Sequence, residues 1–119
     1  MSKVNELIQQ YTDDAIEIRR RIHRYPELSM EEKNTTEFIS QQLLKYGIEI
    51  SDIPFKSGVL GILKGGEDGH IILLRADIDA LPMVEKSRLP FASENTGVCH
   101  SCGHDRPAVG CTGFKFPSR

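Results

Sequence analysis

The run Ile71-Ile72-Leu73-Leu74 constrains the fold more than any other feature of this chain. It follows a glycine-rich turn at 65–69, and two shorter extended segments, 48–55 and 59–63, precede that turn. The run places apolar side chains on both faces of a strand. Such strands are typical of the interior of a sheet that helices cover on both sides. The sequence therefore predicts an α/β fold with residues 71–74 as a buried strand.

The first fifty residues predict two helices joined by a turn. Apolar residues recur at helical spacing from Val4 to Ile22, and the pattern ends at Tyr25-Pro26, because a residue before proline disfavours the helical conformation. Ser29 and Glu32 have the spacing of a capping box, which predicts the start of a second helix. Gly47 is placed to end that helix in a left-handed conformation.

Composition limits the class of protein. The chain has 119 residues, 39% of them hydrophobic and 27% charged, and a net charge of −2, which is typical of one ordinary domain and argues against nucleic-acid binding. No apolar stretch approaches the length of a membrane span, and the N-terminus lacks a signal region, so we expect no membrane partner and a cytoplasmic location. The three cysteines, confined to 99–111, favour a reducing compartment over a disulfide framework.

Chemistry is concentrated in the segment 99–105, Cys-His-Ser-Cys-Gly-His-Asp. Cys102 and His104 offer a thiolate and an imidazole to a borderline-soft divalent ion, and a carboxylate follows at once. Asp77 and Asp79 come directly after the predicted strand, where ligands of open α/β sheets gather. Their spacing lets both carboxylates face one site. The pattern favours half of a metal-dependent hydrolase site.

Two other functions are compatible with the same residues. A small zinc module could use Cys99, Cys102, His104 and Cys111, with His100 as an alternate ligand, although these positions are crowded for a four-coordinate site. The chain could also be a non-catalytic remnant that acts only when a partner supplies the rest of a site.

Three motifs together carry a family resemblance. They are His23-Arg-Tyr-Pro-Glu-Leu-Ser29, Leu74-Arg-Ala-Asp-Ile-Asp-Ala-Leu-Pro82 and Gly97-Val-Cys-His-Ser-Cys-Gly-His-Asp105. In order and approximate spacing they resemble the M20 metallopeptidase family, in particular its amidohydrolase branch of N-acyl-amino acid, hippurate and auxin-conjugate hydrolases. The resemblance implies a mixed-sheet catalytic domain flanked by helices, a separate lid domain, and a two-metal centre of manganese, zinc, cobalt or nickel that hydrolyses a small N-acyl amino acid or related amide.

The resemblance also assigns roles to individual residues. Cys102 and His104 match the first two metal ligands of that branch, and Asp77 matches an acidic residue that hydrogen-bonds and orients a ligand. His23 and Glu27 lie in a motif that is expected to pack the connection after the first helix.

The sequence departs from the family after Asp105. The family continues with a second histidine and a helix, whereas here Arg106-Pro107 follows. The glutamates that supply the general base and a further ligand, later histidines and the lid domain are expected downstream in the family. We therefore expect residues 1–105 to be the N-terminal part of a catalytic domain without its lid, and 106–119 to be an atypical, disordered tail. Such a chain is expected to be inactive alone and to self-associate through its uncovered strand.

Overall fold

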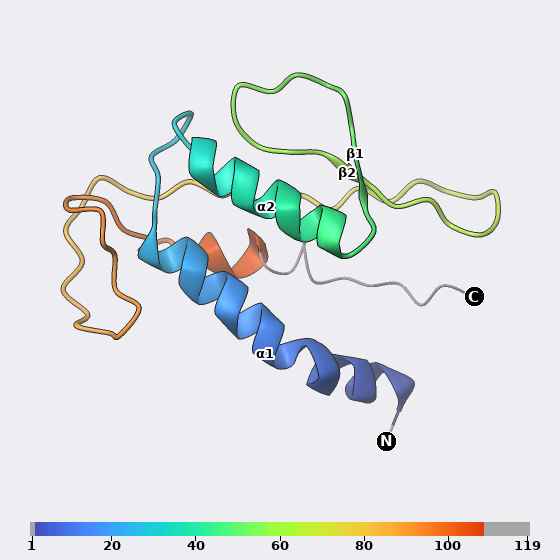
Figure 1. Cartoon of the computed structure of the whole chain (residues 1–119), viewed down its shortest axis with the longest axis horizontal. Coiled ribbons are helices and arrows are strands. Elements are labelled where there is room, and N and C mark those ends of the chain that lie inside the picture. Colours follow the sequence, from blue (N-terminus) through green and yellow to red (C-terminus); the bar gives the residue numbers. More distant parts are fainter. Residues whose placement is uncertain (1, 109–119) are drawn as a thin grey trace.

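The computed structural model describes residues 2–108 of the chain, with two helices packed beside a small sheet (Figure 1). The elements are α1 (Lys3–Arg24), α2 (Lys33–Lys45), β1 (Glu49–Ile50) and β2 (Gly61–Ile62). The two strands pair antiparallel, with Glu49 opposite Ile62 and Ile50 opposite Gly61. Helices combined with a small sheet confirm the predicted α/β class. Neither helix in this part of the chain combines the length and apolar content that a membrane crossing requires.

Helix α1 follows the predicted apolar stripe but buries only its second half. Ser2 caps the helix by accepting a hydrogen bond from the Asn5 N–H at 3.4 Å, and the helix ends at Arg24, as the following proline motif predicts. Ile18 and Ile22 are buried, whereas the first two turns, with Val4 and Ile8, are exposed. The stripe therefore correctly predicts the helix, although its N-terminal half covers no core.

The start of α2 depends on Glu27 rather than on the predicted capping box. Glu32 stands at the N-cap position without any side-chain cap bond, so the Ser29–Glu32 prediction is wrong. Instead the Glu27 carboxylate accepts hydrogen bonds from the backbone N–H groups of Asn34 at 3.1 Å and Thr35 at 2.5 Å. These are donors that the first turn of a helix leaves without partners. A negative charge here also interacts favourably with the positive end of the helix dipole.

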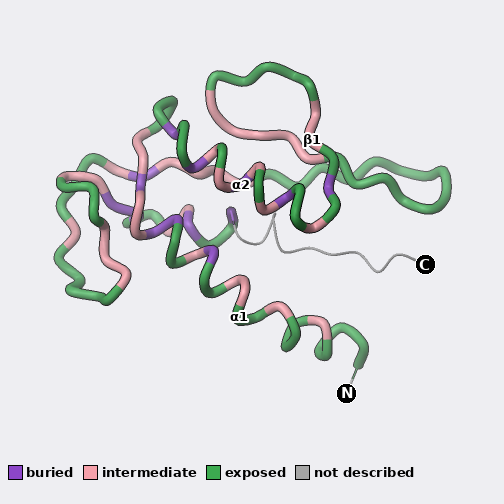
Figure 2. Tube along the Cα trace, viewed as in Figure 1, coloured by how far each residue is buried: buried purple, intermediate pink, exposed green. Residues whose placement is uncertain are grey.

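The core lies between α1, α2 and the start of the sheet. Figure 2 shows the buried positions along the facing sides of these elements. The buried cluster consists of Ile18, Ile22, Ile39, Leu43, Ile48 and Ala108. Gly61 packs so closely against it that an added Cβ would lie 2.9 Å from Ile48 Cγ2, so only glycine fits. Gly47 ends α2 with a φ of 75°, which confirms its predicted left-handed conformation.

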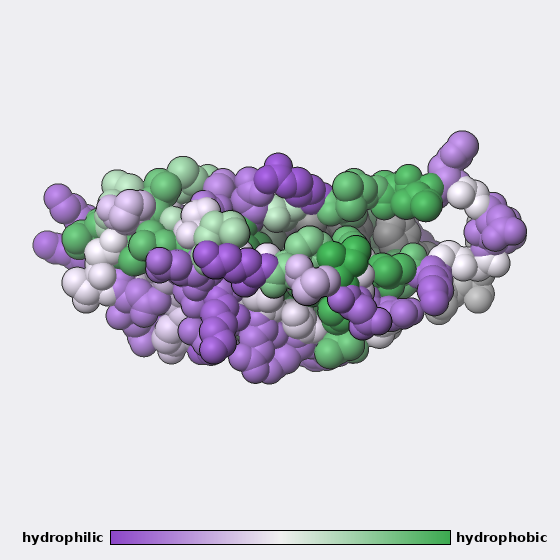
Figure 3. Space-filling view, turned by 90° about the horizontal axis from the view of Figure 1, so that it is seen from above, coloured by the Kyte–Doolittle hydropathy of each residue, from purple (hydrophilic) through white to green (hydrophobic). Residues whose placement is uncertain are grey.

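The prediction of a buried strand at 71–74 is wrong for the described structure. Ile71 is 98% exposed, Ile72 80%, Leu73 76% and Leu74 53%, and none of them belongs to a strand. A strand that is apolar on both faces needs neighbours at both edges and cover on both faces, but β1 and β2 pair only with each other in the described part. Hydrophobic side chains consequently gather at the surface toward the β1–β2 end of the molecule (Figure 3).

The expected tail, 106–119, begins with three residues that the structure describes. Positions 105–108 form a helical turn, and Pro107 is tolerated there because the first turn of a helix leaves its N–H groups unpaired. Ala108 is buried in the core cluster. Residues 109–119 lie outside the described residues, so the disordered tail stays a prediction.

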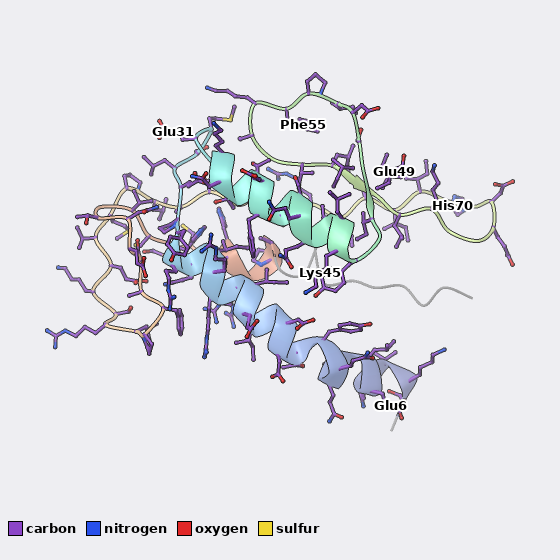
Figure 4. All side chains as sticks on the ribbon, in the orientation of Figure 1. Glu6, Glu31, Lys45, Glu49, Phe55 and His70 are labelled. Carbon is purple, nitrogen blue, oxygen red and sulfur yellow. The ribbon has the colours of Figure 1, made fainter. Side chains whose placement is uncertain are left out.

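We predict that Glu27→Ala lowers the free energy of unfolding by about 1–2 kcal/mol, because the backbone N–H groups of exposed Asn34 and buried Thr35 at the start of α2 lose their acceptor. Urea unfolding monitored by circular dichroism measures this change. Glu31→Ala is the matched control on the same connection (Figure 4), since its exposed carboxylate makes no cap bond in the described structure. Equal effects of the two substitutions would contradict the capping role.

The exposed run 71–74 leads to a prediction about association. We expect the 119-residue chain to form concentration-dependent oligomers in sedimentation velocity, and Ile72→Lys with Leu74→Lys to shift it toward monomer, because two charges prevent burial of the apolar strand. Val4→Lys, at an equally exposed apolar position on α1, should leave the oligomers unchanged. A wild-type chain that is monomeric at every concentration would refute this prediction.

Candidate functional site

Backbone pairing brings the three sequence motifs together. Ala80 forms an isolated parallel bridge with Leu28, and its N–H donates to the Glu27 carbonyl at 2.8 Å. The next residue, Leu81, forms an antiparallel bridge with Cys99, with N···O distances of 2.9 and 3.0 Å. The segment after Asp79 is therefore held between the connection that follows α1 and the start of the Cys-His motif.

His104 is oriented by Asp79. The imidazole Nδ1 lies 2.8 Å from Asp79 Oδ1 and 3.2 Å from the Asp79 backbone oxygen, so Nδ1–H donates to this residue. A histidine that donates from Nδ1 to a carboxylate keeps its Nε2 lone pair available and gains basicity, which is the usual arrangement of a metal-bound imidazole. The His104 side chain is partly buried, and its Nδ1 is held by Asp79.

Cys102 presents a free thiol at the surface, two positions before His104. Gly103 between them has a φ of 80°, in the left-handed region that favours glycine, so the chain can turn between the two side chains. Cys102 and His104, the two residues predicted as ligands, thus lie on one tight turn. Their role as ligands stays a prediction.

The described residues do not assemble the alternative zinc module. Cys99 is buried, and its Sγ lies 2.8 Å from the Ser101 hydroxyl, whereas Cys102 is exposed. Within residues 2–108 no group of three histidine, cysteine, aspartate or glutamate side chains is placed to hold a metal ion. Cys111, the fourth ligand of that module, lies outside the described residues.

Asp77 does not make the contact that the resemblance assigns to it. Its Oδ1 lies 2.6 Å from Arg75 Nη2, where Arg75 is largely exposed and Asp77 is partly exposed. The carboxylate on His104 belongs to Asp79 instead. Because the two aspartates share one face of an extended segment, sequence spacing cannot choose between them. An orienting role for Asp77 stays a prediction.

Behind the turn at 102–104, which holds the two predicted ligands and is called the ligand turn below, lies a buried charged cluster that the sequence analysis missed. Asp105 is only 1% exposed, and its Oδ2 lies 3.2 Å from Arg19 Nε and 3.0 Å from His23 Nδ1. The other ring nitrogen of His23, Nε2, contacts Glu85 Oε1. His23 therefore does more than pack the helix connection. No sequence signal identified this cluster, since the spacing of residues does not show that Asp105 is buried and needs a cationic partner.

His100 is the most unusual polar group near this cluster. Its ring is buried, and neither nitrogen has a hydrogen-bond partner in the described structure. Burial lowers the pKa of the His100 imidazole, since desolvation outweighs the opposing attraction of Asp105. His100 therefore stands beside the cluster as a neutral ring.

Comparison with known proteins shows which family the chain belongs to. The model of peptidase family M20/M25/M40 matches residues 73–114. An N-acetyl-L-cysteine deacetylase from Bacillus subtilis is 48% identical over 101 residues, covering 85% of this chain and 24% of the relative. A hippurate hydrolase from Campylobacter jejuni is 44% identical over 88 residues, covering 74% of this chain and 23% of the relative.

A solved structure agrees with these relatives. The crystal structure of a dinuclear metal-binding peptidase of the M20 family from Bacillus subtilis superposes with a TM-score of 0.85 at 45% identity, over 87% of this chain and 29% of that one. This chain spans about a quarter of the length of the curated relatives named above. By sequence and by fold, the chain belongs to the M20 peptidase family and to its amidohydrolase branch.

Proposed function

We propose that this chain supplies the first two metal ligands, Cys102 Sγ and His104 Nε2, of an amidohydrolase centre that cleaves N-acyl amino acids or related small amides. The observation that carries the proposal is the Asp79 carboxylate on His104 Nδ1, which leaves Nε2 for a metal. The deacetylase and hippurate hydrolase names of the relatives support the substrate class. Free thiols at Cys99 and Cys102 support a reducing, cytoplasmic setting.

The donor set fits a divalent metal ion. An accessible thiol and an oriented imidazole can bind zinc, cobalt, nickel or manganese with different affinities. The sulfur ligand favours zinc and cobalt. A bound pair of such ions would activate a water molecule and polarise the amide carbonyl. The chain's own contribution is to hold the two ligands in one orientation, through Gly103 and Asp79, before any metal binds.

The same geometry limits what these 119 residues do alone. Two ligands leave most of a two-metal shell unfilled, and residues 2–108 contain no third ligand in position. Hydrolysis of an amide also needs a general base placed near the attacking water. Asp79 is committed to His104, and Asp105 and Glu85 are committed to His23. We therefore propose that catalysis needs residues beyond the described part of the chain.

The ligand pair is tested by binding of Co²⁺ to the purified chain. We expect a thiolate-to-cobalt absorption band that weakens as the pH falls, because the Cys102 thiol must lose its proton to bind. Cys102→Ser and His104→Ala should each abolish or greatly weaken the band, whereas Cys99→Ser should not. An unchanged band in both ligand variants would refute the assignment.

The predicted inactivity has its own assay. Zinc- or manganese-loaded chain should release no amino acid from N-acetyl-L-cysteine or from hippurate above the rate of the metal salt alone, because residues 2–108 supply neither an uncommitted general base nor a third ligand in position. Release of free amine over hours measures this. Turnover by the wild-type chain that disappears in Cys102→Ala would overturn the expectation.

Paired variants decide which aspartate orients the imidazole. Asp79→Asn should weaken Co²⁺ binding by about 10- to 100-fold, because loss of an orienting carboxylate typically has that effect. Asp77→Asn is the matched control and should leave binding nearly unchanged, since its carboxylate pairs with exposed Arg75. The reverse pattern would assign the orienting role to Asp77, as the resemblance implies.

A further inference from the structure

The cluster behind the ligand turn is a continuous chain of charged groups. Arg19 and His23, on successive turns of α1, both contact Asp105 Oδ2. His23 continues the chain to Glu85 Oε1, and Glu85 Oε2 accepts from the Ser93 N–H at 2.6 Å. The contacts of Arg19 and His23 join residues more than sixty positions apart in the sequence and connect α1, the segment 85–93 and the ligand motif.

The geometry determines the protonation state of His23. Each ring nitrogen faces a carboxylate oxygen, and an ionised carboxylate can only accept hydrogen bonds. A neutral imidazole has a single N–H, so with both carboxylates ionised the two contacts are satisfied only when the ring carries two protons. His23 and Arg19 then balance the negative charges of Asp105 and Glu85. This balance matters because His23 and Asp105 are buried, and an uncompensated charge there is strongly unfavourable.

Two rings lie beside His23, and neither adds a positive charge to the cluster. Phe91 packs edge-on against His23 with ring centroids 5.5 Å apart, and the His100 ring lies at 6.4 Å. His100 is neutral because of its burial, as described above. Its ring adds no positive charge that would compete for the two carboxylates.

The cluster acts on the ligand turn through the backbone. Asp105 directly follows His104 and begins the helical turn at 105–108. The His104 ring is held by Asp79, whereas its backbone is held through the neighbouring Asp105 side chain and His23. We propose that His23, as a doubly protonated imidazole bridging Asp105 and Glu85, is a positioning residue that sets the place of His104 for metal binding. This inference rests on the proposed function, because it concerns the same ligand pair.

The protonation state is tested without any variant of the cluster. In ¹⁵N NMR of the metal-free chain at neutral pH, both ring nitrogens of His23 should show the shifts of protonated nitrogens. His70 is the internal control, because it lies exposed on the loop that projects beyond β2 (Figure 4) and has no carboxylate partner in the described structure. A His23 ring with one unprotonated nitrogen would overturn the proposal, whether or not the chain binds metal.

The positioning role is tested by Co²⁺ affinity. His23→Gln should weaken binding by about 10-fold or more, whereas the matched His70→Gln should not change it. Adding Glu85→Gln to His23→Gln should recover part of the lost affinity, because it removes the carboxylate left without a cation. If His23→Gln weakened Co²⁺ binding only through lost packing, adding Glu85→Gln would not recover the affinity.

The possible failures are distinguishable. If the wild-type chain binds no Co²⁺, the proposed ligand pair fails and the positioning role fails with it, while the NMR result still decides the charge of His23. If the wild-type chain binds and His23→Gln binds equally well, only the positioning role is refuted. If His23→Gln does not fold, Glu85→Gln alone serves as the test. It should weaken binding through loss of one carboxylate, and unchanged affinity would overturn the proposal.

Discussion

The structure around the site depends on the burial of one carboxylate. Asp105 is almost fully enclosed, and an isolated charge in that position would destabilise the fold by several kcal/mol. Arg19 and His23 from α1 supply the compensating charges. Because Asp105 immediately follows His104, the need to neutralise this carboxylate also determines where the ligand turn can lie relative to the first helix.

Two isolated backbone bridges hold the site together in addition to the charged contacts. The bridges from Leu28 to Ala80 and from Leu81 to Cys99 align three segments that are far apart in the sequence. No long sheet is needed for this alignment, since each bridge spans a single residue pair. The result is a rigid frame around His104 in which Asp79 orients the ring. The two predicted ligand side chains can therefore be arranged by these residues before any metal is present.

The apolar segment 71–74 contrasts with this frame. The second motif is held by specific contacts from Asp79 onward, whereas the hydrophobic run 71–74 that leads into it lacks cover in the described structure. Hydrophobic burial requires a partner surface, and hydrogen bonds between side chains cannot replace it. In relatives about four times as long, additional chain is available to provide such a surface.

The sequence by itself determined the local elements and the family. Helical spacing predicted α1 and most of α2, Gly47 predicted the end of α2, and three motifs in order identified the M20 resemblance, because these signals depend on residues close together in the chain. Only the tertiary structure decided which partner each polar group takes. Glu27 rather than Ser29 caps α2, Asp79 rather than Asp77 holds His104, and His23 bridges Asp105 and Glu85. The contacts of Asp79 and His23 join distant residues, and all three choices depend on burial and charge, which neither periodicity nor spacing records.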